Sequence, residues 1–292
     1  MLSKISRRGF NATFSLASRQ QNWQAERLDA IGTRKIFDED HDLFREQARK
    51  FFNSVPKERR AKWEVDRMAD AEIWKEAGAA GLLGIDTPAE YGGIGADFKY
   101  CLVAEEEQAY AGPDFFGPGF GLHSNIVMPY IFKYGTEEQK HKYLPELTSG
   151  EVISCIGMTE PSAGSDLQGI KTVARRDGDD WIINGSKTFI SNGFLSTLAV
   201  VVARTDMDKK AAHGTSLFLV DKREHDGFNK GKVLNKVGQH TYDTAELFFD
   251  DVRVPSSAIL GGEEFLNKGF YCLMDELPRE RLLIADQGKG IS

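Results

Sequence analysis

The sequence predicts an α+β fold, in which a helical N-terminal part is followed by a β-rich middle part. From Asp38 to about Gly150, apolar residues recur at three- and four-residue spacing, which is typical of amphipathic helices. After Gly150, short runs rich in β-branched and aromatic residues are separated by Gly, Asp and Lys clusters. From Gly269 the helical spacing returns. Because helices and strands are grouped rather than alternating, a doubly wound parallel sheet is not expected.

Composition narrows the class of protein. The 292 residues are enough for two domains of ordinary size. The net charge of −7 argues against nucleic acid as a partner, since such binding needs a basic surface. No apolar run approaches the roughly 18 residues of a transmembrane helix. The cysteines form no C-x-x-C pair, so neither a metal site nor a disulfide framework is expected; they are Cys101, Cys155 and Cys272.

The first residues differ from the rest of the chain. The segment MLSKISRRGFNATFSLASRQ is basic, Ser-rich, amphipathic and free of acidic residues. This pattern is typical of a mitochondrial transit peptide, which we place at residues 1–25. A disordered basic tail is the alternative. A secretory signal would need a longer continuous apolar centre.

Four helices are expected before Gly150. HDLFREQARKFFNSV has Asp38 and Asp40 before it as possible N-caps, and AEIWKEAGAAGLLGI ends at glycines. The glycine-rich TPAEYGGIGAD reads as a loop. YCLVAEEEQAYA and TEEQKHKYLPEL complete the set, and Thr136 followed by Gln139 is a capping-box pattern.

The β-rich part contains four clear signals. DDWIINGSKTFISNG holds two short runs around Asn184-Gly185, a dipeptide that strongly favours a hairpin turn. LAVVVART, TSLFLVDK and TAELFFDDVRV follow as strands. FYCLMDELPRERLLIAD, after Gly269, is predicted to be a helix with an apolar face.

One polar segment, GMTEPSAGSDLQG at residues 157–169, is the best candidate for a ligand site. Its hydroxyl groups and backbone N–H groups are accessible because Ala163 and Gly164 carry little side chain. Such a loop can approach a planar or phosphorylated ligand, although an ordinary surface turn has the same composition. There is no G-x-G-x-x-G, no phosphate loop and no H-E-x-x-H, so a Rossmann unit is not supported.

This segment closely resembles the acyl-CoA dehydrogenase signature M-T-E-P-x-A-G-S-D-x-x-G. A second family segment, K-x-[FW]-I-[ST]-N-G, is matched at residues 187–193, and ELPRERLLIAD at 276–286 most resembles the long-chain branch. The resemblance implies an N-terminal helical domain at 34–155 and a middle β-barrel-like domain at 156–255. Residues 256–292 would be the first helix of a C-terminal helical domain that is otherwise truncated.

The resemblance also implies FAD as cofactor. Met158 and Thr159 match positions that bond the flavin pyrimidine ring. Gly164 and Ser165 match positions near the FAD pyrophosphate and the bound thioester.

Further positions follow from the second segment and from the long-chain branch. Phe189 matches an aromatic packed on the isoalloxazine, and Ser191 matches a hydroxyl near flavin N5. Phe189 could equally be an ordinary core aromatic. His213, Gly214 and Tyr271 match substrate-contact positions, although His213 alone would read as a solvated loop histidine.

The catalytic base implied by the resemblance is Glu280, in an E-R-L run that the long-chain and isovaleryl branches share. Arg281 is assigned to the substrate site. Pro278 suits a first helical turn, which would place Glu280 near a helix N-terminus. Glu276 is the lesser candidate. Without the resemblance, Glu280 and Arg281 would read as solvated partners on a helix surface.

The activity implied is FAD-dependent α,β-dehydrogenation of long-chain fatty acyl-CoA to trans-2-enoyl-CoA in the mitochondrial matrix, with electrons passing to an electron-transfer flavoprotein. Family members continue into a helical bundle that supplies homotetramer contacts, so poor FAD retention and exposed apolar surface on residues 269–285 are expected of this chain. The alternatives are a catalytically inactive truncated isoform or interaction module, an isovaleryl-type dehydrogenase and an acyl-CoA oxidase.

Overall fold

The structure, a computed structural model, describes residues 27, 30, 32, 34–112 and 119–288. The predicted transit peptide lies outside these residues. The chain divides into two compact units, Met1–Asp42 and Leu43–Ser292. The second unit contains the sheet and nearly all of the helices, and α1 begins at Glu39, within the first.

The helices expected before Gly150 are present, and the Thr136–Gln139 capping box is confirmed. Two further helices, α2 and α5, had not been predicted. Helix α2 has few apolar residues, and among its described residues Trp63 is the buried one. Its sequence therefore shows almost no helical spacing of apolar positions. The bounds are α1 (Glu39–Ser54), α2 (Lys57–Asp66), α3 (Glu72–Ala79), α4 (Phe98–Tyr110), a π-helix η5 (Leu122–Val127), α5 (Met128–Tyr134) and α6 (Glu137–Thr148).

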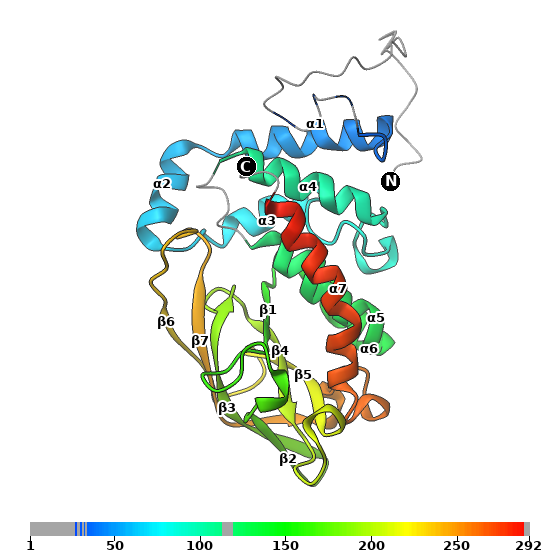
Figure 1. Cartoon of the computed structure of the whole chain (residues 1–292), viewed down its shortest axis with the longest axis vertical. Coiled ribbons are helices and arrows are strands. Elements are labelled where there is room, and N and C mark those ends of the chain that lie inside the picture. The colour runs from blue at the N-terminus through cyan, green and yellow to red at the C-terminus, as the bar shows by residue number, and fades with distance from the viewer. Residues whose placement is uncertain (1–26, 28–29, 31, 33, 113–118, 289–292) are drawn as a thin grey trace. The chain divides into compact units, whose positions relative to one another are not determined.

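After α6 the chain forms a seven-stranded sheet that curls into a half-barrel (Figure 1). Its strands are β1 (Ser154–Gly157), β2 (Val173–Asp177), β3 (Asp180–Ser191), β4 (Leu198–Arg204), β5 (Thr215–Asp221), β6 (Phe228–Val233) and β7 (Thr244–Pro255). The order is β1-β4-β2-β3-β7-β6, with β5 also paired to β4. The strand β4 pairs in parallel with β1 and β2 and antiparallel with β5. Helices followed by a sheet confirm the α+β prediction.

The hairpin predicted at Asn184-Gly185 is wrong. Strand β3 runs straight through this dipeptide, with a register irregularity against β7 between Ile183 and Gly185. A side chain at Gly185 would meet Thr172 at 2.4 Å, so the glycine serves close approach rather than a turn. The actual hairpin joins β2 to β3 at Gly178, where φ is 65°.

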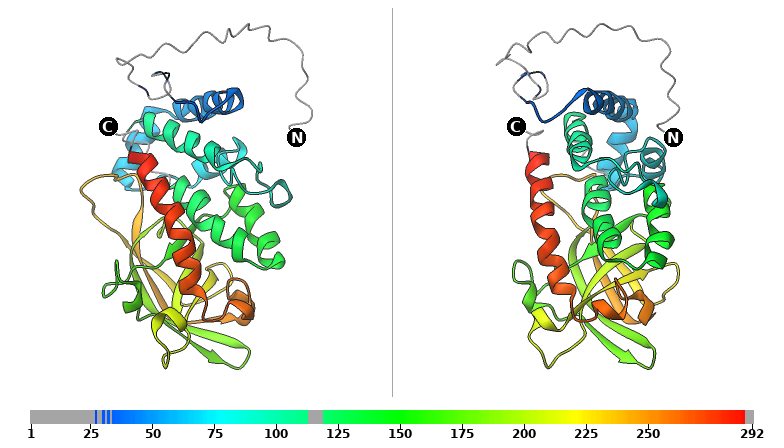
Figure 2. Two further views of the ribbon diagram at one scale, coloured as in Figure 1. Left: turned by 45° about the vertical axis from the view of Figure 1, so that its right-hand side comes forward. Right: turned by 90° about the vertical axis from the view of Figure 1, so that its right-hand side faces the viewer.

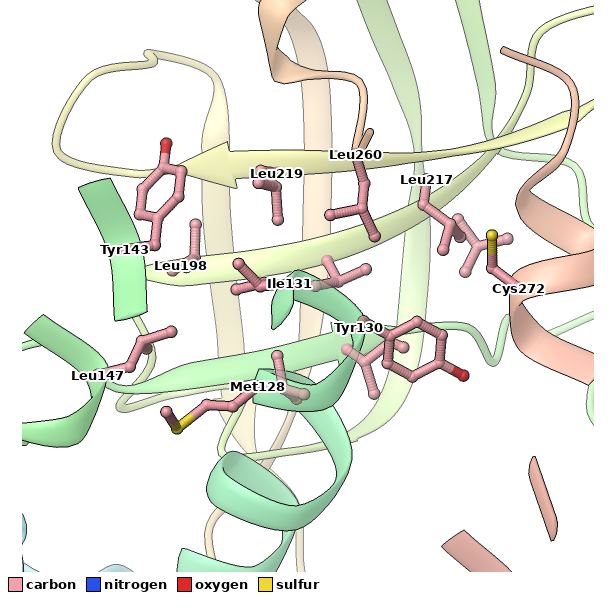
Figure 3. Close-up of a cluster of buried hydrophobic side chains, with 14 of the residues drawn as sticks. Met128, Tyr130, Ile131, Tyr143, Leu147, Leu198, Leu217, Leu219, Leu260 and Cys272 are labelled. Atoms are coloured by element: carbon pink, nitrogen blue, oxygen red, sulfur yellow. The ribbon is translucent and has the colours of Figure 1, made fainter. Parts of the chain in front are cut away.

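Two apolar clusters lie on the two faces of the sheet, and β4 contributes to both because its side chains alternate. The first cluster joins the sheet to α5, α6 and the C-terminal helix (Figure 3). The second fills the inside of the curled sheet. The residues of β4 divide as Leu198, Val200 and Val202 in the first cluster and Ala199, Val201 and Ala203 in the second.

The last element is α7 (Gly269–Gln287), which packs against α4, α5, η5 and β5 (Figure 2). The prediction that Pro278 opens this helix is wrong, because Pro278 lies inside it. Cys272 and Leu273 are buried in the first cluster, and this packing holds the helix together on the N-terminal side of the proline. Glu280 is therefore remote from the helix N-terminus and from its dipole.

The expected exposed apolar surface of α7 is present, at Tyr271, Met274, Leu282 and Ile284. Among the described residues, no helix has the length and apolar character needed to cross a bilayer.

A buried histidine ties η5 to β1. His123 accepts hydrogen bonds from the backbone N–H and hydroxyl of Ser154 at Nδ1, at 3.1 and 2.9 Å. Its Nε2 donates to the carbonyl of Leu147 at 3.0 Å. Burial lowers the pKa of His123 to about 4, so the ring is neutral in the folded chain at physiological pH.

Acid should therefore unfold the chain partly through His123. The unfolded histidine takes up a proton below about pH 6.5, whereas the folded one does so only near pH 4, so stability falls as pH falls between these values. We expect the parent to lose about 2 kcal/mol more unfolding free energy between pH 7 and 5 than His123→Gln. Urea titrations at both pH values measure this. Equal losses in both proteins would contradict it, and His141→Gln is the matched control at an exposed histidine.

A buried ion pair anchors the loop after β1 to β3. Lys187 is 1% exposed, and its Nζ lies 2.8 Å from Glu160 Oε1 and 2.7 Å from the carbonyl of Val202. Burial lowers the pKa of Lys187 to about 8. Burial acts to raise the pKa of Glu160, but Lys187 and the backbone N–H groups of Lys171 and Thr172 outweigh it and keep the pKa below its usual value. Every oxygen of this carboxylate is thus bonded.

Removal of the cation should be strongly destabilising. Lys187→Met leaves the Glu160 carboxylate buried without its counter-charge, and we expect a loss of about 3–5 kcal/mol in unfolding free energy. Lys75→Met is the matched control, because Lys75 pairs with Glu151 at 2.9 Å on the surface. Chemical denaturation of the parent protein and the two variants measures the change in unfolding free energy. A similar small effect of both substitutions would refute the role of the buried pair.

Candidate active site

The segment predicted to bind a ligand follows β1 directly. Met158 and Thr159 are half-buried where the strand ends, and Met158 packs against the first cluster. The carbonyl of Thr159 accepts a hydrogen bond from the backbone N–H of Thr188 at 3.0 Å. Together with the Lys187–Glu160 pair, this bond fixes the loop against β3.

The next residues form an exposed turn. Glu160 and Ala163 exchange two backbone hydrogen bonds, of 2.8 and 3.0 Å, and Ala163 is buried beneath them. Gly164 and Ser165 lie beyond the turn and are exposed. No heavy atom beyond its immediate neighbours lies within 4 Å of where a side chain at Gly164 would begin, so a ligand can approach the backbone there.

Phe189 is displayed on the surface. It is 68% exposed and has a φ of 57°, at the irregularity between Lys187 and Ile190 where β3 slips against β7. This excludes the alternative of a core aromatic. A left-handed backbone at an aromatic residue is strained, and such positions are concentrated at functional sites.

The end of β3 is held by polar contacts. Ser191 is half-buried and pairs with Thr244 on β7. Asn192 also has a φ of 57°, and its Nδ2 donates to the carbonyls of Gly119 and Ser154, at 3.1 and 3.3 Å. Ser191 therefore lies between the exposed Phe189 and the buried Asn192.

Two of the predicted substrate-contact residues touch one another. Tyr271, in the first turn of α7, and His213, at the end of the short 3₁₀ helix Ala211–His213, are both exposed. The Tyr271 hydroxyl lies 2.9 Å from His213 Nδ1. The adjacent Gly214 is buried, and a side chain there would meet the carbonyl of Asp206 at 2.2 Å. The structure thus gives Gly214 a packing role in addition to any contact with substrate.

Glu280 is a buried carboxylate without a directly bonded cation among its described contacts. It is 9% exposed, and its Oε1 accepts a hydrogen bond of 2.8 Å from the hydroxyl of Tyr130. Burial and the nearby Glu276 raise the pKa of Glu280, while the Tyr130 hydrogen bond and Arg281 oppose the rise. Glu280 is not the solvated partner of Arg281 that the alternative reading describes, although Arg281 itself is exposed.

Glu276 has a different environment. It is also buried, but Lys133 Nζ lies 2.8 Å from its Oε1, and Tyr134 donates to the same oxygen at 3.3 Å. Glu276 and Lys133 line a pocket of about 310 Å³ between α5 and α7. A carboxylate bonded to a cation must leave that contact before it can take up a proton, so the geometry favours Glu280 over Glu276.

The structure brings several of these residues onto one core. Met158, Tyr130 and the N-terminal half of α7 all pack into the first cluster. Along α7, Tyr271 and Glu280 are separated by roughly 14 Å. Tyr130 was missed by sequence reasoning, because a tyrosine in the apolar run MPYIFKY gives no sign of its partner. In the described part of the chain, no cluster of three or more His, Cys, Asp or Glu residues could hold a metal ion.

Two family models match the chain. Residues 38–151 match the acyl-CoA dehydrogenase N-terminal domain, and residues 155–252 match the middle domain. The chain is 53% identical over 270 residues to the mitochondrial long-chain specific acyl-CoA dehydrogenase of Rattus norvegicus, which covers 92% of this chain. It spans 61% of the length of that relative.

Solved structures agree. The acyl-CoA dehydrogenase of Geobacillus kaustophilus superposes with a TM-score of 0.83 at 44% identity, covering 88% of this chain and 67% of its own. A glutaryl-CoA dehydrogenase of Mycobacterium smegmatis, solved in complex with FADH2, gives 0.77 at 32% identity, covering 87% and 62%. With both domain models matched in order and the fold shared, the chain belongs to the acyl-CoA dehydrogenase family.

Proposed function

We propose that this protein catalyses FAD-dependent α,β-dehydrogenation of long-chain fatty acyl-CoA, with Glu280 as the base. The observation that carries the proposal is the burial of the Glu280 carboxylate beside the neutral donor Tyr130, on the core that also seats Met158. Such a carboxylate can accept a proton without first leaving a salt bridge. The identity to the rat long-chain enzyme supports the choice of branch.

The exposed surface at the end of β3 suits a flavin. Phe189 offers an aromatic face that the chain does not cover, and the turn at Gly164 leaves its backbone open. A bound flavin supplies the acceptor for a hydride. The residues proposed to hold it are Met158 and Thr159 at the ring edge, Phe189 and Ser191 at the ring, and Gly164 and Ser165 at the pyrophosphate.

Glu280 removes the α-proton of the thioester in this proposal. Its pKa is raised chiefly by burial, which brings it closer to the working pH and makes it a better proton acceptor. The product is the trans-2-enoyl thioester. Substrate contacts are assigned to Ser165, His213, Gly214, Tyr271 and Arg281, and the exposed guanidinium of Arg281 suits the anionic part of the CoA moiety.

The remaining parts of the proposal concern the complete protein. A mitochondrial matrix enzyme of fatty acid oxidation, with an electron-transfer flavoprotein as electron acceptor and a homotetrameric assembly, fits the family and the mitochondrial location of the rat relative. Absorbance at 450 nm after reconstitution with FAD, followed by anaerobic addition of palmitoyl-CoA, is the direct test. A protein that stays colourless, or a flavin that is not bleached, would contradict the proposal.

Glu280→Gln should remove turnover while retaining the flavin. The amide is isosteric but takes up no proton, so we expect flavin reduction to slow by about a thousandfold. Glu276→Gln is the matched control, since it neutralises another buried carboxylate one turn earlier on α7. Stopped-flow bleaching compares the variants at equal FAD occupancy. Retention of most activity by Glu280→Gln would assign the base elsewhere.

Phe189→Ala should weaken FAD binding. Loss of the exposed aromatic face removes ring packing, and we expect the Kd for FAD to rise by about tenfold with little change in stability. Phe248→Ala is the control, because Phe248 is 41% exposed on the neighbouring strand β7. Fluorescence titration with FAD measures both. If the two variants weaken FAD binding equally, Phe189 has no special role.

A further inference from the structure

We propose that Tyr130 is a positioning residue for Glu280: its hydroxyl holds the carboxylate in one orientation and favours its ionised form. This inference rests on the proposed function, which makes Glu280 the base. Nothing in the sequence pattern of α5 assigns such a role to Tyr130.

The geometry of Tyr130 makes it a rigid donor. The residue is fully buried, and its ring is packed in the first cluster with Met128, Ile131 and Cys272. Figure 3 shows the ring inside this cluster with its hydroxyl pointing away from Met128 and Ile131. Because the ring has only two side-chain torsions and both are fixed by packing, the hydroxyl oxygen has a defined position, 2.8 Å from Glu280 Oε1.

The other polar groups around Glu280 are directed elsewhere. On α7, Glu276 bonds Lys133, and Arg279 bonds Asp86 and the carbonyl of Asn125. Arg281 is exposed and acts on Glu280 only through its charge.

On the elements packed against α7, polar side chains other than Tyr130 also bond groups other than Glu280. On α5, the side chains of Lys133 and Tyr134 each hydrogen-bond the carboxylates of both Asp275 and Glu276. On η5, the titratable side chain is His123, which bonds Leu147 and Ser154. The carboxylate of Glu105 on α4 accepts a bond from Asn125. Among the described hydrogen bonds, the donor to the Glu280 carboxylate is therefore Tyr130.

The hydroxyl opposes two effects that favour the protonated acid. Burial and the charge of Glu276 both raise the pKa of Glu280, and the Tyr130 bond counteracts them because a hydroxyl donates more strongly to a carboxylate than to an acid. Without this donor, a smaller fraction of the base is ionised below neutral pH. The carboxylate also loses the contact that fixes its orientation.

Two tyrosines one turn apart on α5 provide a matched pair of variants. Tyr130 bonds Glu280, whereas Tyr134 bonds Asp275 at 2.7 Å and Glu276 at 3.3 Å. Tyr130→Phe and Tyr134→Phe each delete one hydroxyl and keep the ring. Thermal unfolding and FAD content confirm that both variants are folded before any comparison is made.

The first measurement is the pH profile of flavin reduction by palmitoyl-CoA in the FAD-reconstituted protein. We expect Tyr130→Phe to slow reduction by about tenfold at pH 6, with the difference shrinking as pH rises, and Tyr134→Phe to keep the parent profile. A merely structural role for Tyr130 would lower FAD content or thermal stability and leave the profile in place. A parent-like profile in Tyr130→Phe would overturn the proposal.

The second measurement needs no turnover. Glutamate labelled with carbon-13 at Cδ reports each carboxyl titration by NMR, and Glu280→Gln assigns the resonance. The midpoint of Glu280 should move to higher pH in Tyr130→Phe and stay in place in Tyr134→Phe. If this shift occurs in a protein that never bleaches, the coupling stands and the proposed function fails; an unmoved midpoint refutes the role of Tyr130 whatever the activity.

Replacement of Tyr130 by 3,5-difluorotyrosine strengthens the hydrogen-bond donor, whereas Tyr130→Phe removes it. The ring and hydroxyl remain, but the hydroxyl is more acidic and donates more strongly. The Glu280 midpoint should then move to lower pH than in the parent protein. An upward or absent shift would contradict a donor role for this hydroxyl.

Discussion

The apolar contact between the helices and the outer face of the sheet is the constraint on which the site depends. Strand β4 supplies side chains to both clusters and is buried on both faces, which explains why LAVVVAR is apolar without alternation. Each large side chain buried there contributes roughly 1.5–3 kcal/mol. Because α5, α7 and Met158 share the first cluster, the helix that carries Glu280 and the loop after β1 cannot move independently without opening this core.

The same low-dielectric interior gives three polar contacts their strength. Lys187–Glu160 is a fully bonded ion pair, His123 is a neutral ring with both nitrogens bonded, and Tyr130–Glu280 is a neutral donor beside a carboxylate. The first two have all their hydrogen-bonding groups satisfied and act as fixed points. Glu280 has a described partner on one oxygen, which fits a group that is held in place and still able to accept a proton.

Periodicity predicted the elements whose side chains pack regularly. In strands β4, β5 and β7 and helices α1, α3 and α6, the apolar pattern of the sequence agrees with burial. Helix α4 was also predicted, but its burial does not follow an amphipathic pattern, because the acidic residues Glu105, Glu106 and Glu107 are buried as well. The errors at Gly185 and Pro278 have one cause: each residue was assigned the local role it most often has, whereas tertiary packing decided. Gly185 lies against Thr172, and Pro278 is carried inside a helix anchored by Cys272 and Leu273. Helix α2 gave no signal because little of it is buried.

The sequence motifs predicted which residues belong to the candidate site, but not how their side chains are oriented. In a regular strand, residues 187 and 189 would face the same side, because side chains alternate with a period of two. Here Lys187 is buried and Phe189 is exposed, because the left-handed backbone at Phe189 reverses its direction. Such a conformation is unfavourable by about 1–3 kcal/mol and persists only where its surroundings determine it. The Lys187–Glu160 pair fixes one end, and pairing of Ile190 with Ala245 and the bonds of Asn192 fix the other. The segment K-T-F-I-S-N-G therefore contains a buried lysine, Lys187, an exposed aromatic, Phe189, and a buried asparagine, Asn192. Alternation of side chains along a strand would not have predicted this arrangement.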